Sequence, residues 1–370
     1  MKTLYYHQPH TLLNRALRLL QTIIQRKGIL SLFTTLTILL LPLSVQGQTS
    51  NKILINSGWE MQDAAIISKE GMKAGWEMEN AAKVPQEGKV ISTTKYKPSG
   101  WYKATVPGTV LTTLVNNGVY PEPLYGENNR PEVLPEYLCH TDWWYRNEVM
   151  IPDSYKNKTI WLNFDGINYS ADIWVNGHRV GPIKGAFIRG NFDITSFVKP
   201  GQTAIIAVRI SPQPNTGVPF EHIMGTVGGP CGGVGRLDGP TFGCSNGWDW
   251  LSGIRDRNSG IWQDVFLSAT GHVLMKDPLI TSDLPLPRTD IASVTVQTTV
   301  QNTTGNVQKG IIKGSFDSIK FEKTIEIAPW RSLTFTFDPK DFAQLNIKNP
   351  KLWWPNGLGE QNLYSMHLSF

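Results

Sequence analysis

The chain has 370 residues, of which 40% are hydrophobic and 18% charged, with 34 glycines, 24 prolines and 13 tryptophans. This composition is typical of a globular protein and excludes a disordered chain, a collagen and a coiled coil. The net charge of +5 comes from residues 1–47, which contain five basic residues and no acidic one, so the remainder carries 30 charges of each sign and gives no argument for nucleic acid binding.

Residues 1–47 have the pattern of an export signal. Basic residues as far as Lys27 precede an apolar run over 28–43, and the small residues Val45 and Gly47 suit the cleavage positions. The pattern predicts a signal peptide over 1–47, a mature chain from Gln48, and an exported protein that is periplasmic, at the cell surface or extracellular. Because the basic region is long, an uncleaved membrane anchor is the alternative.

After residue 48, short β-rich runs between turn residues predominate. Residues 58–65 recur as residues 75–82, and we interpret this echo as a duplication within a hairpin. Residues 107–114 predict the start of a single short helix, and residues 143–151 alternate like a strand.

The next elements in chain order predict a β-sandwich. Strands are expected over 159–164, 169–175 and 204–210, and Asn176-Gly177 predicts a type I′ turn because both of its central residues must adopt positive φ. Strands at this spacing, with turn residues between them, are typical of sandwiches.

A change of composition near residues 270–280 marks a predicted domain boundary. Period-two alternation over 293–300 and 333–338 predicts strands with one buried face, as in an immunoglobulin-like sandwich. About six strands fit between 273 and 370, and the last, from Leu363, runs to the end of the chain. We therefore expect a domain over 48–272, a second over 273–370, and a truncated chain.

A glycine-rich segment, with nine glycines over 225–247, leads into Trp248, Asp249 and Trp250. Loops of this length are uncommon in compact domains unless they have a function. Tryptophan faces stack on sugar rings and a carboxylate accepts paired hydroxyls, so we expect these three residues to contact a ligand, with core packing as the alternative. Cys231 and Cys244 in the same region either form a disulfide or remain free thiols, and Cys139 is predicted to be a small buried side chain.

Charged residues alternate over 254–262. We interpret them as a buried ionic network that shapes the loop, and a surface that faces a ligand is the alternative.

A glycosidase needs two carboxylates about 5–10 Å apart. Glu148 is interpreted instead as a sheet-face residue of the strand 143–151, and the chain contains neither a nucleophile elbow nor a His-Glu-x-x-His motif. We therefore assign no catalytic residue, no metal site and no cofactor.

The chain resembles glycoside hydrolase family 2, in its exo-β-D-glucosaminidase and endo-β-mannosidase branch. The resemblance extends from about residue 57 to the end of the chain and rests on six motifs, at 106–110, 144–146, 165–177, 247–250, 254–262 and 352–357. It implies an all-β chain with a jelly-roll (galactose-binding-like) sandwich followed by an immunoglobulin-like β-sandwich. It further implies a (β/α)8 barrel that carries the two glutamates of a retaining mechanism, and this barrel is absent here.

The resemblance also implies that Trp248, Asp249 and Trp250 grip the terminal sugar of an oligosaccharide or glycan substrate. We therefore expect the chain to be the amino-terminal part of an exported β-glycosidase, inactive alone. A stand-alone carbohydrate-binding module or surface lectin is the alternative, and a cell-wall spacer is a third possibility that leaves the glycine-rich segment unexplained. Contact with a membrane is expected only if the leader stays uncleaved.

Overall fold

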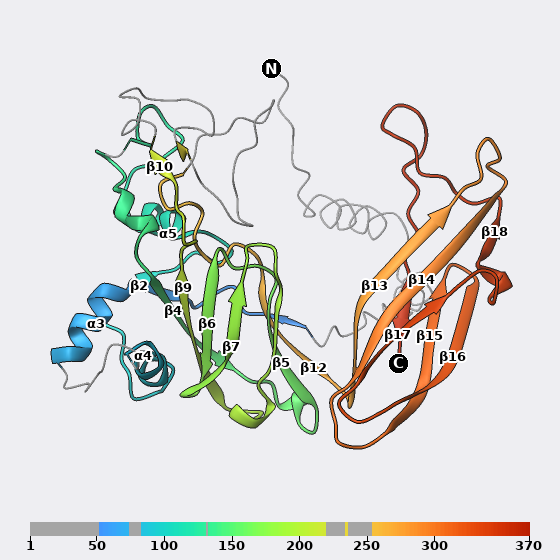
Figure 1. The fold of residues 1–370 in the computed structure, drawn as a ribbon, viewed down its shortest axis with the longest axis horizontal. Coiled ribbons are helices and arrows are strands. Elements are labelled where there is room, and N and C mark those ends of the chain that lie inside the picture. Colours follow the sequence, from blue (N-terminus) through green and yellow to red (C-terminus); the bar gives the residue numbers. More distant parts are fainter. Residues whose placement is uncertain (1–51, 74–82, 131, 220–233, 236–253) are drawn as a thin grey trace, which may run out of the picture. The chain divides into compact units, whose positions relative to one another are not determined.

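The computed structural model describes residues 52–73, 83–130, 132–219, 234–235 and 254–370 (Figure 1). The leader predicted over 1–47 lies outside these residues. Within them, no helix has the length and apolar character needed to cross a bilayer. As expected, this part of the chain is predominantly β-structure and forms two β-sandwiches.

The first sandwich contains a six-stranded antiparallel sheet with the order β3-β2-β4-β9-β6-β7 and a four-stranded antiparallel sheet with the order β1-β12-β5-β8. The strands of the first sheet are β2 (Glu60–Asp63), β3 (Tyr102–Lys103), β4 (Trp143–Met150), β6 (Ser170–Val175), β7 (His178–Lys184) and β9 (Thr203–Ser211). Those of the second are β1 (Ile53–Leu54), β5 (Thr159–Phe164), β8 (Gly190–Asp193) and β12 (Val265–Thr270). The strands expected over 159–164, 169–175 and 204–210 are thus confirmed.

Both sheets contribute to one hydrophobic core. Tyr145 and Ile206 from the larger sheet and Leu162 and Leu267 from the smaller one have no exposed surface and belong to the same buried cluster. Each such side chain contributes about 1.5–3 kcal/mol on burial. The predicted turn also forms, because Asn176 and Gly177 have φ values of 49° and 85° between β6 and β7.

Two helices contradict the expectation that this region holds a single short helix. The expected helix is present as α5 (Val110–Asn116), but α3 (Ala64–Lys73) and α4 (Lys83–Ile91) lie between β2 and β3. They contribute Ala64, Ile67 and Ile91 to a second buried cluster with the sheet residues Trp144, Trp174 and Ala207.

The hairpin interpretation of the echo is therefore wrong. The first copy spans β2 and the start of α3, so a helix and not a turn follows its strand, while the second copy, 75–82, lies outside the described residues. The sequence did not predict α4, because this helix contains Pro85 and Gly88 and both residue types are poor helix formers. Pro85 is tolerated in the first turn of a helix. Gly88 serves the packing, since a Cβ at this position would lie 2.1 Å from Cε2 of Trp174.

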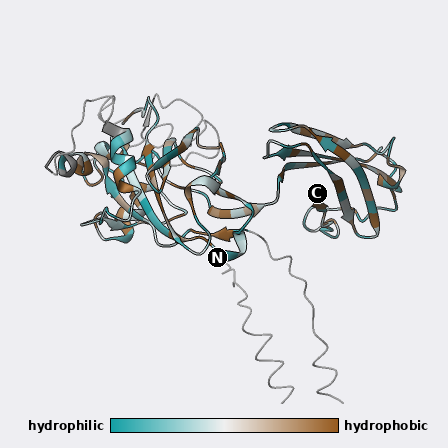
Figure 2. Cartoon of the chain, turned by 90° about the horizontal axis from the view of Figure 1, so that it is seen from below, coloured by the Kyte–Doolittle hydropathy of each residue, from teal (hydrophilic) through white to brown (hydrophobic). Residues whose placement is uncertain are grey.

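The second sandwich pairs two sheets of the predicted immunoglobulin-like kind. In one, β14 (Ile291–Asn302) bonds with β13 (Val273–Asp283), β17 (Ser332–Phe337) and β18 (Asn346–Lys348); in the other, β15 (Gln308–Phe316) lies between β16 (Ile319–Ile327) and β19 (His367–Ser369). Buried and half-buried side chains alternate strictly along β14. Figure 2, coloured by hydropathy, shows hydrophobic and hydrophilic segments following one another along the strands.

The strand count and the last strand differ from the prediction. The described residues 273–370 form seven strands rather than about six, and the last is β19 rather than a strand from Leu363. Residues 362–364 instead bond with the segment around Lys351, because Asn362 Nδ2 donates to the Leu352 carbonyl and the Lys351 amide donates to the Tyr364 hydroxyl. The domain boundaries 48–272 and 273–370 stay a prediction.

Candidate functional site

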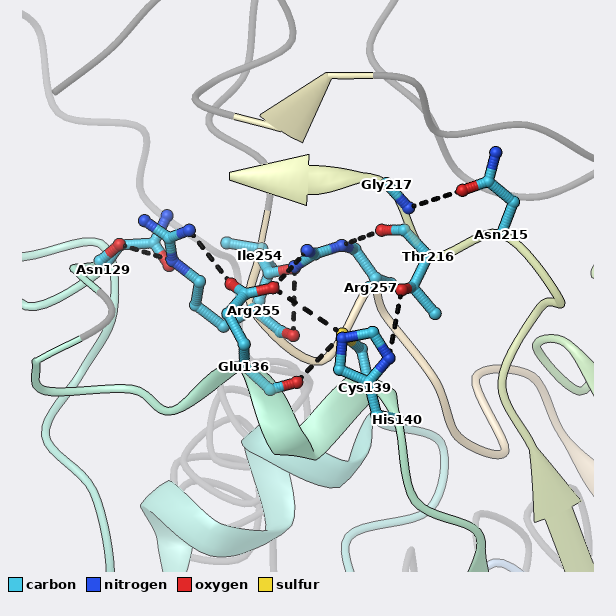
Figure 3. A network of polar contacts seen from close by, with 10 residues as sticks. All are labelled: Asn129, Glu136, Cys139, His140, Asn215, Thr216, Gly217, Ile254, Arg255 and Arg257. Carbon is cyan, nitrogen blue, oxygen red and sulfur yellow. Dashed lines mark hydrogen bonds and ion pairs between the residues drawn. The ribbon is translucent and has the colours of Figure 1, made fainter. Parts of the chain in front are cut away.

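The predicted sugar contacts Trp248, Asp249 and Trp250 lie outside the described residues, as do Cys231 and Cys244. The structure does describe the residues on either side of this segment, which include Thr216 and Ile254. A buried polar network joins these two flanks (Figure 3). This network is the candidate functional site.

Glu136 is the centre of the network. Its Oε1 accepts a hydrogen bond from Arg255 Nη1 at 3.1 Å, and its Oε2 accepts one from Arg257 Nη2 at 2.5 Å. The two arginine side chains are 2% and 1% exposed, and that of Glu136 is 16% exposed. Charges this deeply buried are tolerated only with opposite charges and hydrogen bonds around them.

The arginines also bind backbone carbonyls on both sides of the undescribed segment. Arg257 Nε donates to the Thr216 carbonyl at 2.6 Å, and Arg257 Nη1 donates to the Ile254 carbonyl at 3.3 Å. Arg255 Nε donates to the Asn129 carbonyl at 2.9 Å. Strand β10 (Val218–Pro219) begins two residues after Thr216 and pairs with β11 (Val234–Gly235). The Arg257 guanidinium group therefore links Thr216 with Ile254.

Asp256 accepts hydrogen bonds from backbone amides, one of them in the first turn of α5. Its Oδ2 accepts a hydrogen bond from the Leu111 amide at 2.7 Å, and its Oδ1 accepts one from the Asn258 amide at 2.8 Å. Burial raises the pKa of this carboxyl group, and the amide donors act against that rise. Gly260 brings the chain so close to the Gly108 carbonyl oxygen that a Cβ would lie 2.6 Å from it.

The motif 254–262 is thus the buried ionic network that the sequence predicted. Arg255, Asp256 and Arg257 all have partners within the protein. Glu136, the shared partner of the two arginines, was missed because it lies 121 residues before Arg257. Glu148 lies on β4 with its carboxylate 2.8 Å from Arg146 Nη2, in agreement with the sheet-face interpretation.

Glu136, Cys139 and His140 place potential metal ligands within 4.8 Å of one another. This donor set does not suit a cation. The carboxylate of Glu136 already accepts from two guanidinium groups, and the Cys139 thiol donates to the Glu136 carbonyl oxygen at 3.1 Å. A bound thiol must be deprotonated, whereas burial raises the pKa of Cys139 to about 11.

The same pKa predicts an unreactive thiol at Cys139, which is buried as expected. With a pKa of about 11, about one thiol in a thousand is ionised at pH 8, against about one in four at the ordinary cysteine pKa. We expect N-ethylmaleimide at pH 8 to label Cys139 at least about 100-fold more slowly in the folded chain than in urea. Mass spectrometry of the peptide that contains Cys139 measures both rates, and equal rates would contradict the assignment.

Comparisons with known proteins identify the family of the chain. A family model described as the galactose-binding domain-like part of glycosyl hydrolase 2 matches residues 76–263, and a second, described as glycosyl hydrolases family 2, matches residues 273–370.

One curated relative is an exo-beta-D-glucosaminidase of Streptomyces avermitilis, which is 30% identical over 75% of this chain and 28% of the relative. Another is a mannosylglycoprotein endo-beta-mannosidase of Lilium longiflorum, which is 34% identical over 75% of this chain and 30% of the relative. The solved exo-chitosanase of Amycolatopsis orientalis is 25% identical with a TM-score of 0.62, over 85% of this chain and 31% of that one. The chain thus spans less than a third of the length of these proteins. By its two consecutive domain matches, the chain belongs to glycoside hydrolase family 2.

Proposed function

We propose that the chain is the amino-terminal part of an exported β-glycosidase of the exo-β-glucosaminidase or β-mannosidase type, and that it does not hydrolyse glycosides alone. The observation that carries the proposal is the order of the two family matches, 76–263 and 273–370, in a chain that spans less than a third of its relatives. The relatives are named for the hydrolysis of glucosaminides and mannosides. Export rests on the leader at 1–47.

Within this function, Trp248, Asp249 and Trp250 contact the terminal sugar. Support comes from the Glu136 network, which holds Thr216 and Ile254 together at the base of the segment that carries these residues. A binding surface has to be supported by rigid neighbours, because an error of about 1 Å in position weakens it. The ionic network binds the Thr216 and Ile254 carbonyls through Arg257.

The test is hydrolysis by the full chain alone. With 4-nitrophenyl β-glucosaminide and β-mannoside as substrates, we expect the unaltered chain and its Glu148→Gln variant to release nitrophenol no faster than buffer does. Turnover that Glu148→Gln abolishes would contradict the proposal.

The stand-alone binding module also predicts no turnover, and oligosaccharide binding separates the two functions. If the chain holds only part of a larger sugar site, titration calorimetry with chitosan or mannan oligosaccharides should show no saturation of binding below about 1 mM. The reason is that such a site leaves most of the ligand surface uncovered. Tighter binding that Trp248→Ala or Asp249→Ala weakens would instead favour the module.

A further inference from the structure

Four asparagines in the sequence precede a glycine, at positions 117, 176, 246 and 356. An asparagine in this position can lose its side-chain amide without an enzyme, because glycine has no side chain to shield its backbone nitrogen from the asparagine carboxamide. Asn246 lies outside the described residues, and the structure places the other three in different surroundings. These surroundings distinguish the asparagines that are restrained from the one that can react.

Hydrogen bonds restrain both reacting groups of the pair Asn176-Gly177. Asn176 Nδ2 donates to the Phe197 carbonyl at 2.7 Å, and Asn176 Oδ1 accepts from the Ile205 amide at 2.8 Å. The Gly177 amide, whose nitrogen would be the nucleophile, donates to Ser92 Oγ at 3.0 Å. Because these bonds fix the carboxamide and the nitrogen separately, Asn176 can react only after this part of the sandwich opens.

The pair Asn117-Gly118 is restrained in a similar way at the end of α5. Asn117 Nδ2 donates to the Lys103 carbonyl at 3.0 Å and to the Thr113 carbonyl at 2.7 Å. The Gly118 amide donates to the Val115 carbonyl at 2.9 Å. Both residues of the pair are exposed, but the hydrogen bonds hold the two reacting groups in fixed positions until the end of the helix opens.

The pair Asn356-Gly357 lacks these restraints. Both residues are exposed, and within the described part of the chain neither the Asn356 carboxamide nor the Gly357 amide has a hydrogen-bond partner. A Cβ at Gly357 would have no atom within 4 Å, so the space around this residue is open. Across the turn, the Leu358 amide donates to the Pro355 carbonyl at 2.9 Å. An exposed hydrogen bond of this kind opens readily, which lets the Gly357 nitrogen reach the Asn356 side chain.

We infer that Asn356 is a self-modification site, at which asparagine is converted to aspartate and isoaspartate. The Gly357 nitrogen attacks Cγ of Asn356 and the Cγ–Nδ2 bond breaks. The carboxamide nitrogen leaves as ammonia with the proton of the Gly357 amide, and a cyclic succinimide forms. Water then opens this ring at either of its carbonyl carbons, so the net reaction consumes one water and releases one ammonia.

The reaction changes the loop that carries two exposed aromatic side chains. It replaces a neutral amide by a carboxylate in the loop of Trp353 and Trp354, which are 56% and 43% exposed. Ring opening at the backbone carbonyl also adds one carbon to the backbone within the turn, where the Leu358 amide now bonds to Pro355. We therefore expect the loop to gain a negative charge and to lose this turn as the protein ages.

Mass spectrometry of the full chain tests the inference. The chain is incubated at mildly alkaline pH, either folded or in urea, and separation of the asparagine, aspartate and isoaspartate forms of each peptide gives the rate at each asparagine. In the folded chain we expect Asn356 to convert at least about tenfold faster than Asn117 and Asn176, because those two require local opening. In urea the three rates should agree within about threefold, since all three asparagines precede a glycine.

Two variants test the route of the reaction. Gly357→Ala places a methyl group beside the attacking nitrogen, and Asn356→Gln moves the carboxamide one carbon further from it. Both should slow the conversion at position 356 and leave the rates at Asn117 and Asn176 unchanged, and thermal unfolding checks that both variants are folded.

Three results would overturn the inference. A rate at Asn356 in the folded chain no higher than at Asn117 and Asn176 would show that the turn protects it. An equal advantage of Asn356 in urea would show that the local sequence, and not the structure, sets the rate. An unchanged rate in Gly357→Ala would exclude attack by the Gly357 nitrogen.

Discussion

Replacing Glu136 by alanine is expected to lower the free energy of unfolding by about 3–5 kcal/mol. The substitution removes a carboxylate that both Arg255 and Arg257 contact, and the side chains of these arginines are 2% and 1% exposed. Removal of one charged partner from a buried ion pair costs several kcal/mol, because the protein interior solvates the remaining charge poorly. The 16% exposure of Glu136 admits some water, which places the expected loss in the lower half of that range.

Urea denaturation followed by tryptophan fluorescence measures this loss. The matched control is Glu148→Ala, which also removes a carboxylate paired with a buried arginine. Arg146 keeps its hydrogen bonds to the Ile91 and Thr93 carbonyls, and Glu148 is 51% exposed, so the control should cost less than about 1 kcal/mol. Similar losses in the two variants would contradict the role of Glu136 as the shared counter-ion.

The contrast between these glutamates shows what sequence reasoning can reach. The alternation within its own strand was enough to predict the position of Glu148, and the identity of two residues was enough to predict the turn at Asn176-Gly177. Both were predicted. Glu136 is one of thirty acidic residues, and nothing local relates it to Arg257. Its role became visible only when folding brought together elements 121 residues apart.

The helices α3 and α4 were missed for a different reason. Local propensity and tertiary packing act in opposite directions there, because Gly88 disfavours a helix in isolation and yet permits its contact with the sheet. Likewise, a strand is predicted from Leu363, whereas β19 covers only His367–Ser369 and the Tyr364 hydroxyl accepts from the Lys351 amide. Sequence patterns therefore predicted the sheets well and predicted the contacts between elements poorly.

The second large effect is expected at Gly88. In an open helix position, glycine to alanine stabilises a protein by about 0.5–1 kcal/mol. Here the added atoms would meet the Trp174 ring, whose Cε2 and Cζ2 lie 2.1 and 2.6 Å from the position of a Cβ. Trp174 is 2% exposed and packs on Trp144 with ring centroids 5.2 Å apart, so the ring has no free space into which to move.

Gly88→Val should therefore destabilise the chain by about 3 kcal/mol, and Gly88→Ala by about half as much, although helix propensity alone predicts the opposite sign for both. Urea denaturation measures the two losses, and near-ultraviolet circular dichroism should report the displaced tryptophan pair. Gly271→Val is the control, since no atom lies within 4 Å of a Cβ at that exposed position. A Gly88→Val variant as stable as the Gly271→Val variant would show that α4 does not pack on Trp174 as described. A loss of stability at Gly88 and not at Gly271 would establish that Gly88 permits the contact between α4 and Trp174. The free energy that glycine costs the helix is then smaller than the free energy that a side chain would cost by its clash with the indole ring.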